Sequence, residues 1–486
     1  MTMTTTTPVT TVRFGRTSTR GLMLGFSTSR VVAVGTAITV LVIGLFTSGG
    51  TGAMVASVVW IPLSASAFVR VAGRPAIEWA GVALGFGTRH QTKQTEYRSQ
   101  LPIKPRPAGT LALPGDAAAL RFHVDPTTGA AMIHDPHRQT LTAVLSVSHQ
   151  AFVLLDADER NQRVAHWGRL YAALAQSGTC AALQVLEATI PDPARGQIEW
   201  YADHGVGVND GSLVDQEYRE LLSMGQLAAG THRTTISLSL NMKSTAKAIK
   251  AAGRGMTGAA NVLRGDMASL SDGLRQASLR VGHWLSEAEL AAIIRGAYDP
   301  AAILDPRSDP GANLDHAGPM AISEHWEYLR HDGAYSAVLW ISEWPRIEVQ
   351  PNFLHALIFA PDIRRTFSLV AHPLPTDAAL RQIRKEKTEA ITDSAQKAKV
   401  GQLADLSDAQ EYADLLARER SVVAGHTDVE FSGFVTVTAP TMEALDSAKQ
   451  LIIRAASSAA CEVRPVYGHQ LQSFVLAALP LARKGF

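Results

Sequence analysis

The chain has 486 residues, of which 46% are apolar, 18% charged and 6% aromatic. This apolar content and a formal net charge of +1 exclude a disordered polyelectrolyte and a globally basic nucleic-acid-binding protein. The length suggests about three units, at roughly 150 residues each. The two cysteines, Cys180 and Cys461, are too few for a disulfide framework, which favours reduced thiols in a cytoplasmic body.

An uncharged segment of 39 residues, Val31 to Val69, follows a basic N-terminal tail over residues 1–30. A single straight helix of this length would span almost 60 Å, about twice the hydrocarbon thickness of a bilayer. The middle of the segment has a composition typical of a turn, with Ser48, Gly49, Gly50 and Gly52. The sequence therefore predicts a transmembrane helical hairpin over residues 31–70, with legs Val31–Phe46 and Ala53–Val69.

The charges around this hairpin predict its orientation. Arg30, Arg70 and Arg74 flank it closely, and the turn between the legs carries no charge. By the positive-inside rule, both chain ends and the main body lie in the cytoplasm, and the hairpin anchors the protein in the plasma (inner) membrane. The alternatives are a cleaved signal peptide, for which the apolar stretch is too long, and a buried hairpin of a soluble protein.

Residues 71–118 are expected to form an interfacial segment and a proline-rich linker. Ile77–Gly87 is apolar apart from one glutamate, and suits either an interfacial helix or a short helix packed on the body. Four prolines and many polar residues then mark the linker over residues 88–118.

The next part of the chain, residues 119–319, has the pattern of an α+β unit. A helix with apolar residues at helical spacing is predicted over Asp158–Gln176. Strands are predicted on either side of it from alternating or β-branched runs, at Leu120–Val124, Ala130–His134, Leu141–Ser148, Cys180–Ala188 and Thr234–Met242. An Ala/Gly/Ser-rich stretch, residues 243–282, interrupts the pattern and is interpreted as a loosely packed helical insertion.

A second α+β unit is expected over residues 320–486. Strands are predicted at Ala334–Ser342, Phe367–Ala371, Phe431–Thr438 and Cys461–Val466, with a helical pair over 377–423 and a helix at Met442–Ser458. Strands and helices in this alternation favour ferredoxin-like, split βαβ units with helical insertions. The predicted fold class is therefore α+β, with a transmembrane hairpin followed by two such units.

No motif of a known catalytic chemistry appears in the sequence. The phosphate-binding pattern G-x-x-x-x-G-K-[ST], the zinc motif H-E-x-x-H and the nucleophile motif G-x-S-x-G are all absent. We therefore predict no catalytic, metal or cofactor site, and no cofactor. Nothing in the charge pattern indicates a direct nucleic-acid site.

Two regions are candidates for docking a partner. Trp340 and Trp344 end a strand at a proline, and they suit either core packing or a docking edge. The apolar C-terminus contributes Phe474, Leu479, Leu481 and Phe486, which suit either a final helix packed on its own domain or an exposed anchor.

The order of these parts resembles a known family. A two-helix hairpin with basic flanks, followed by Gly73-Arg74-Pro75, is similar to PrgI-like membrane proteins of actinobacterial conjugative transfer, which belong to type IV secretion machines. The body resembles the N-terminal, non-ATPase domain of the TraC-class transfer ATPase. The resemblance lies in the Leu339–Pro345 strand, the Phe367–Pro373 strand, the helical pair and the Gly433–Pro440 strand. Residues 243–282 have no place in it.

This resemblance implies a membrane-anchored structural and docking subunit of a DNA-transfer machine. Its implied partners are the lipid bilayer, a separate P-loop ATPase, other type IV secretion membrane subunits, and further copies of the chain in a homo-oligomer. A membrane-tethered enzyme of unrecognised type is the alternative hypothesis.

Overall fold

The computed structural model describes residues 11–12, 14, 27–99, 107–148, 152–191, 195–205, 210–228, 230–301, 313–360, 363–399 and 406–484. The chain divides into two compact units, each described here by itself. The first, which we call the sheet body, comprises residues 1–13, 95–374 and 429–486. The second comprises residues 14–94 and 375–428, and its described residues include four helices and one small strand pair.

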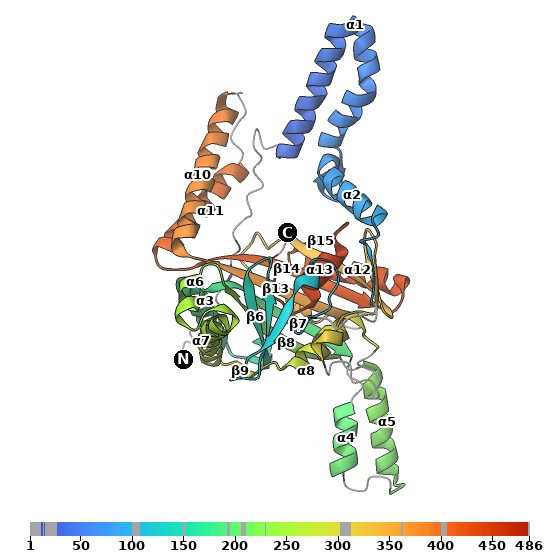
Figure 1. Cartoon of the computed structure of the whole chain (residues 1–486), viewed down its shortest axis with the longest axis vertical. Coiled ribbons are helices and arrows are strands. Elements are labelled where there is room, and N and C mark those ends of the chain that lie inside the picture. The colour runs from blue at the N-terminus through green and yellow to red at the C-terminus, as the bar shows by residue number, and fades with distance from the viewer. Residues whose placement is uncertain are drawn as a thin grey trace, which may run out of the picture. The chain divides into compact units, whose positions relative to one another are not determined.

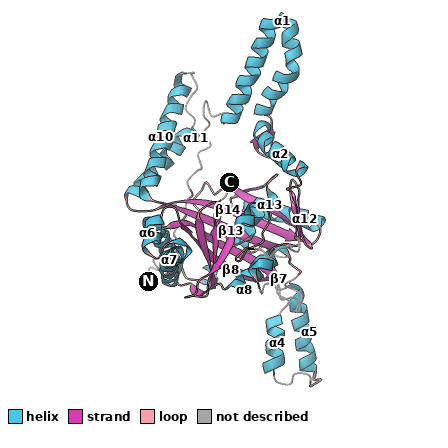
Figure 2. Cartoon of the chain, viewed as in Figure 1, coloured by secondary structure: helices cyan, strands magenta, loops and turns pink. Residues whose placement is uncertain are grey.

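The sheet body is built on one antiparallel sheet of thirteen strands, which Figure 2 shows in magenta with helices against it. Eleven strands follow the order β3-β10-β11-β12-β14-β13-β7-β8-β6-β5-β4, while β15 pairs with β12 and β9 pairs with β6. The α+β class predicted from the sequence is therefore confirmed.

The first half of the sheet body consists of a meander and a β–α–β–β–α–β run. Its strands are β4 (Arg121–Val124), β5 (Ala131–Asp135), β6 (Thr140–Ser148), β7 (Cys180–Pro191), β8 (Gly230–Asn241) and β9 (Arg280–Trp284). Its helices are α3 (Ala157–Ser177), α4 (Arg195–His204), α5 (Leu213–Ala228), α6 (Ala246–Ala251), α7 (Gly255–Gln276) and α8 (Glu287–Tyr298). Strands β9, β6, β8 and β7 lie side by side in that order.

The second half repeats this arrangement in sequence order. Its strands are β10 (Ala321–Glu324), β11 (Leu329–His331), β12 (Ala334–Glu343), β13 (Arg364–Leu374), β14 (Asp428–Ala439) and β15 (Glu462–Pro465). Its helices are α9 (His355–Ile358), α12 (Met442–Ser458) and α13 (Gln470–Ala478), and the pair α10 (Thr376–Lys399) and α11 (Leu406–Val423) follows β13. Strands β15, β12, β14 and β13 again lie side by side, so each half has a 4-1-3-2 strand order.

The two halves meet where β7 pairs with β13, in register from Thr366 opposite Ala188 to Ala371 opposite Leu183. We call this pairing the seam. One helical pair, α4–α5, follows β7, and the equivalent pair, α10–α11, follows β13. The sequence analysis divided the chain between residues 319 and 320. The structure instead joins both halves in one sheet and groups the helical pair 377–423 with the N-terminal helices.

Three large apolar cores lie on the two faces of this sheet. One core spans both halves, with Val144 of β6, Val338 of β12 and residues of α8 and α13. On the other face, α3 and α7 cover the first half, and α9 and α12 cover the second. Alternation along a strand separates them, because successive side chains of a strand point to opposite faces. Val144 accordingly faces one core while Ala143 and Leu145 face another.

The stretch 243–282 is not the loose insertion that the sequence analysis expected. It forms α6 and α7, and α7 is a core helix whose Leu263, Leu270 and Leu274 are fully buried. Its small residues are needed for close packing: a Cβ added at Gly273 would lie 2.7 Å from Leu170 of α3. A high Ala and Gly content therefore reflects a close helix contact here rather than weak packing.

Within residues 71–118, the part expected to be a linker contributes to the sheet body. Strand β3 (Glu96–Arg98) pairs with β10 at one edge of the sheet. Leu111 and Leu113 lie buried in the core that spans both halves, followed by the short helix η1 (Gly115–Ala119). The described residues of this segment nearest η1, including Pro114, are thus packed on the body.

The second unit contains α1 (Thr28–Phe68), the small strand pair β1 (Arg70–Val71) and β2 (Arg74–Pro75), and α2 (Ala76–Gln91). It also contains α10 and α11, which three ion pairs hold together: Lys387 with Glu419, Lys397 with Asp408, and Arg418 with Glu386. The antiparallel pair expected over 377–423 is therefore present, with residues 400–405 between its helices outside the described part of the chain.

Candidate functional site

The N-terminal apolar segment forms α1, a helix of 41 residues. Among the described residues, α1 is the one helix long and apolar enough to cross a membrane. Its large apolar side chains are exposed, up to 88% for Phe46 and 77% for Met54. Such a surface is costly in water and suits a lipid or protein environment.

The backbone of α1 is interrupted at Ser48 and Gly49, where it leaves the helical conformation, and the chain folds back there (Figure 1). Gly49 has a φ of +60°, which favours glycine. The parts of α1 before and after the break approach closely: a Cβ added at Gly52 would lie 2.0 Å from the carbonyl oxygen of Gly44. The predicted turn residues, Gly50 among them, thus lie at or beside the break.

The three predicted flanking arginines lie at the two ends of α1. Arg30 is in its first turn, and Arg70 and Arg74 are exposed on β1 and β2 just after its last turn. Ser27, just before α1, donates a 2.7 Å hydrogen bond to Glu78 of α2. This contact ties the start of α1 to the helix that follows its end.

The C-terminal residues predicted as an exposed anchor lie in the interior instead. Phe474 is 1% exposed, and its ring lies 5.0 Å from those of Tyr298 and His331. Leu479 and Leu481 are buried in the same core. The alternative interpretation, a helix packed on its own body, is what the structure shows, and Phe486 lies outside the described residues.

Buried polar groups hold the start of α13. The Glu324 carboxylate accepts from the backbone N–H of Leu471 at 3.1 Å, and the Gln470 side chain accepts from the N–H of Val338 at 3.0 Å. A carboxylate near the first turn also interacts favourably with the helix dipole.

After α13 the chain runs over the polar face of the sheet near the seam. Gln184 of β7 donates to the carbonyl oxygens of Leu476 (3.2 Å) and Leu479 (3.1 Å) and accepts from the N–H of Ala482 (2.7 Å). Ser237 of β8 donates to the carbonyl oxygen of Pro480 at 2.9 Å. We call residues 479–484 the C-terminal strap.

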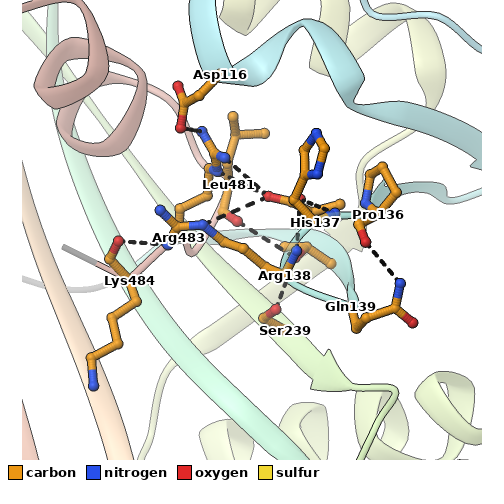
Figure 3. Close-up of polar contacts among 11 residues, drawn as sticks. Asp116, Pro136, His137, Arg138, Gln139, Ser239, Leu481, Arg483 and Lys484 are labelled. Carbon is orange, nitrogen blue, oxygen red and sulfur yellow. Dashed lines mark hydrogen bonds and ion pairs between the residues drawn. The ribbon is translucent and has the colours of Figure 1, made fainter. Parts of the chain in front are cut away.

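A buried ion cluster holds the end of this strap (Figure 3). The Arg483 guanidinium lies 3.1 Å from Asp135 of β5 and 3.0 Å from Asp116 of η1. Arg138 donates to the carbonyl oxygen of Lys484 at 2.6 Å. Asp135 also accepts from the backbone N–H groups of His137 and Arg138, so its charge is well satisfied.

The tryptophans predicted as a docking edge are also packed on the body. Trp340 of β12 is half-buried against the core that spans both halves and lies opposite Phe434 of β14. Trp344 packs against another core, with its ring 6.5 Å from that of Phe353. Core packing, the alternative left open above, therefore describes both.

Burial shifts the pKa values of both cysteines and of one core histidine. Burial raises the pKa of the Cys180 thiol to about 12 and that of Cys461 to about 11, so neither is a ready nucleophile. Burial lowers the pKa of His331 to about 4, and this histidine contacts Ser336 at 2.7 Å inside the core. The described part of the chain contains no cluster of three His, Cys, Asp or Glu side chains suited to a metal ion.

The sequence analysis missed the polar residues beneath the strap. Thr235, Ser237 and Ser239 alternate with Ile236, Leu238 and Leu240 in β8, and such alternation is typical of a sheet with one solvated face. All three are buried. This face of β8 carries small hydroxyl side chains and not charged ones, and that was the sequence signal that it is covered by another part of the chain.

Comparison with known proteins links part of the chain to a secretion system. Residues 228–341 match the family model EccE, whose description is "Putative type VII ESX secretion system translocon". The match covers a minority of the chain, from β8 to β12. No curated protein matches the chain significantly.

This match overturns the resemblance to conjugative type IV proteins, including its actinobacterial PrgI-like hairpin and its TraC-class ATPase partner. The matched residues include the whole of 243–282, which that resemblance left without a place. A proline often ends a strand, so strands that end in Glu-Trp-Pro or His-Pro are not specific to one family. An apolar hairpin is likewise found in membrane anchors of many kinds. These short features carried too little information to identify the machine.

Proposed function

We propose that this chain is a membrane-anchored, non-catalytic structural subunit of a type VII-like protein-secretion translocon. The match of residues 228–341 to the EccE family model is the observation that carries this proposal. These residues run from the first half of the sheet body into the second and include the core helices α7 and α8. The match therefore concerns the scaffold of the body rather than a peripheral loop.

The proposed anchor is α1, with each of its two parts crossing the bilayer. The break at Ser48 and Gly49 divides 41 residues into legs of about 20, the length that a hydrocarbon core of about 30 Å needs. The close approach of Gly44 and Gly52 is typical of helix pairs in membranes, where small residues let backbones approach. The arginines at both ends favour a cytoplasmic location for the N-terminus and the body.

A structural role is also supported by the chemistry of the body. Its buried polar groups bind one another and the C-terminal strap, and they leave no convergent set of nucleophile, base and oxyanion donors among the residues described. We therefore propose that the body, two ferredoxin-like units in one sheet, serves as a rigid platform for other membrane subunits of the secretion system.

Topology reporters test the anchor. Fusions after residues 20, 50 and 110 of the full chain should give cytoplasmic, extracytoplasmic and cytoplasmic signals respectively. A cytoplasmic signal after residue 50 or an extracytoplasmic one after residue 110 would refute the two-leg anchor.

Purification of the tagged full chain from its native membranes tests the assembly. We expect membrane subunits of a type VII secretion system to co-purify in stoichiometric amounts. The same subunits should co-purify in the same amounts with the control variant Cys180→Ser, which alters a side chain with no proposed role. Isolation of the chain with the subunits of a different machine, or alone under several mild detergents, would refute the proposal.

A further inference from the structure

The α4–α5 pair, which lies in the chain between the long strands β7 and β8, is a helical arm that projects from the sheet body (Figure 1). Its two helices are held together by aromatic and polar contacts. The rings of Tyr201 and Tyr218 lie 4.6 Å apart, and the Tyr201 hydroxyl donates to the buried Asp215 at 2.9 Å. The arm is therefore a defined element with its own internal packing.

Large apolar side chains remain on the outside of this arm. Val214 is 78% exposed, Leu213 72% and Leu221 63%, and Trp200 of α4 is 60% exposed. Val214, Tyr218 and Leu221 are spaced i, i+4 and i+7, so they share one face of α5. Contiguous exposed apolar residues of this kind mark an interaction surface.

Acidic residues surround this apolar face. From Trp200 to Leu222 the chain has five acidic residues and one basic residue, a net charge of −4. Asp203, Glu217 and Glu220 are exposed, and Glu217 lies on the same face of α5 as Val214 and Leu221. The surface thus combines an apolar centre with a negatively charged rim.

The equivalent pair in the second half differs from the arm in how its helices are joined. Helices α10 and α11 follow β13 as α4 and α5 follow β7, but three ion pairs connect them. The arm also lies outside residues 228–341, so its surface is a feature of this chain beyond the matched scaffold.

We propose that the arm docks a basic amphipathic helix of another protein, with its apolar face on Val214 and Leu221 and its basic residues opposite Glu217 and Glu220. Charge complementarity selects this occupant. The same arm of a second copy would place like charges together in a two-fold contact, and an anionic membrane surface would repel the acidic rim. This proposal does not depend on the secretion function.

Peptide binding to the full chain tests it. The chain is placed in phosphatidylcholine nanodiscs, and a fluorescein-labelled peptide of three heptads, with leucine at a and d and lysine elsewhere, is titrated by anisotropy against empty nanodiscs. We expect the variants Val214→Ser/Leu221→Ser and Glu217→Lys/Glu220→Lys each to bind about tenfold more weakly than the wild type. Ile391→Ser, which changes an apolar side chain that is 56% exposed on α10, should leave the affinity unchanged.

The remaining outcomes separate the alternatives. The charge variant changes only exposed residues, and far-UV circular dichroism verifies that both arm variants stay folded. Equal affinity of an arm variant and the wild type would overturn the proposal. Equal binding of a peptide with glutamate in place of lysine would also overturn the proposal, because charge would then not contribute to recognition of the peptide. Self-association of the wild type that Val214→Ser/Leu221→Ser abolishes would make a second copy the occupant and would also overturn it.

Discussion

Replacement of Arg483 by methionine should strongly destabilise the sheet body. The change keeps the apolar stem and removes the guanidinium that lies between Asp135 and Asp116 (Figure 3). Loss of one partner from a buried ion pair costs about 3–5 kcal/mol, because the other charge stays buried without compensation. Asp135 keeps its two backbone N–H donors, so we expect the lower end of this range, about 3 kcal/mol.

The second acid adds little to this value. The Asp116 side chain is 41% exposed, and water replaces its lost partner at a cost of about 1 kcal/mol or less. A loss of about 3 kcal/mol is large against a total stability of about 5–15 kcal/mol.

Denaturant unfolding of the full chain in non-ionic detergent, followed by tryptophan fluorescence, measures the change. The matched control is Arg275→Met, which removes an ion pair with Asp272 on the surface and should cost about 0.5 kcal/mol or less. The double variant Asp135→Asn/Arg483→Met should be more stable than Arg483→Met alone, because the orphaned charge is gone. Equal stability of Arg483→Met and the wild type, or no recovery in the double variant, would refute the reasoning.

Three further predictions concern the anchor, the core and pH. Gly52→Leu should force the two parts of α1 apart and lower the melting temperature in detergent, because the added Cβ would clash with Gly44. Gly35→Leu is the control, since a Cβ at Gly35 has open space around it and should leave the melting temperature unchanged. Equal melting temperatures of the two variants would contradict this. Phe474→Ala should cost about 3–5 kcal/mol in denaturant unfolding, as expected for a buried phenylalanine, and a cost below about 1 kcal/mol would show that the site is not a packed core. Burial lowers the pKa of His331 from 6.5 to about 4, so the unfolded chain binds the proton more tightly: stability should be intact above about pH 6.5 and fall towards pH 4, by up to about 3 kcal/mol. Unfolding of His331→Asn across this pH window should show a smaller slope, and an unchanged slope would assign the effect to other groups.

Elements with a strong local signal were predicted closely. The helix expected at Met442–Ser458 is α12 with the same bounds, and its N-cap, Thr441, accepts from the N–H of Ala444. A capping box between Ser286 and Glu289, residues three apart in the sequence, begins α8. The strand expected at Thr234–Met242 lies in β8, which begins earlier, at Gly230, and ends at Asn241. It was predicted because Ile236, Leu238 and Leu240 recur with a period of two. In each case the residues that decide the structure are neighbours in sequence.

The errors arose where distant residues decide the structure. Leu263, Met267, Leu270 and Leu274 of α7 have helical spacing, yet the small residues between them suggested loose packing. The position of Leu170 of α3 beside Gly273 shows that the small residues of α7 allow the two helices to pack closely, and this contact cannot be read from the sequence of α7 alone. For Phe474, Leu479 and Leu481 the sequence left open both docking and packing on their own domain. Their burial is decided by a core that includes distant residues of α8 and β12.

The arrangement at the seam explains why the C-terminus cannot serve as a free anchor. Two repeated halves that pair through β7 and β13 bring hydroxyl and amide side chains of both, such as Gln184 and Ser368, to one buried face. Buried polar groups need partners, and the strap supplies carbonyl and N–H groups to them. A deletion from Leu479 onwards would therefore remove two of the groups that Gln184 binds, the Leu479 carbonyl and the Ala482 N–H, and the guanidinium that pairs with Asp135. Loss of any binding partner after such a deletion would report unfolding of the seam, so docking at this end is tested only by changes that keep the strap in place.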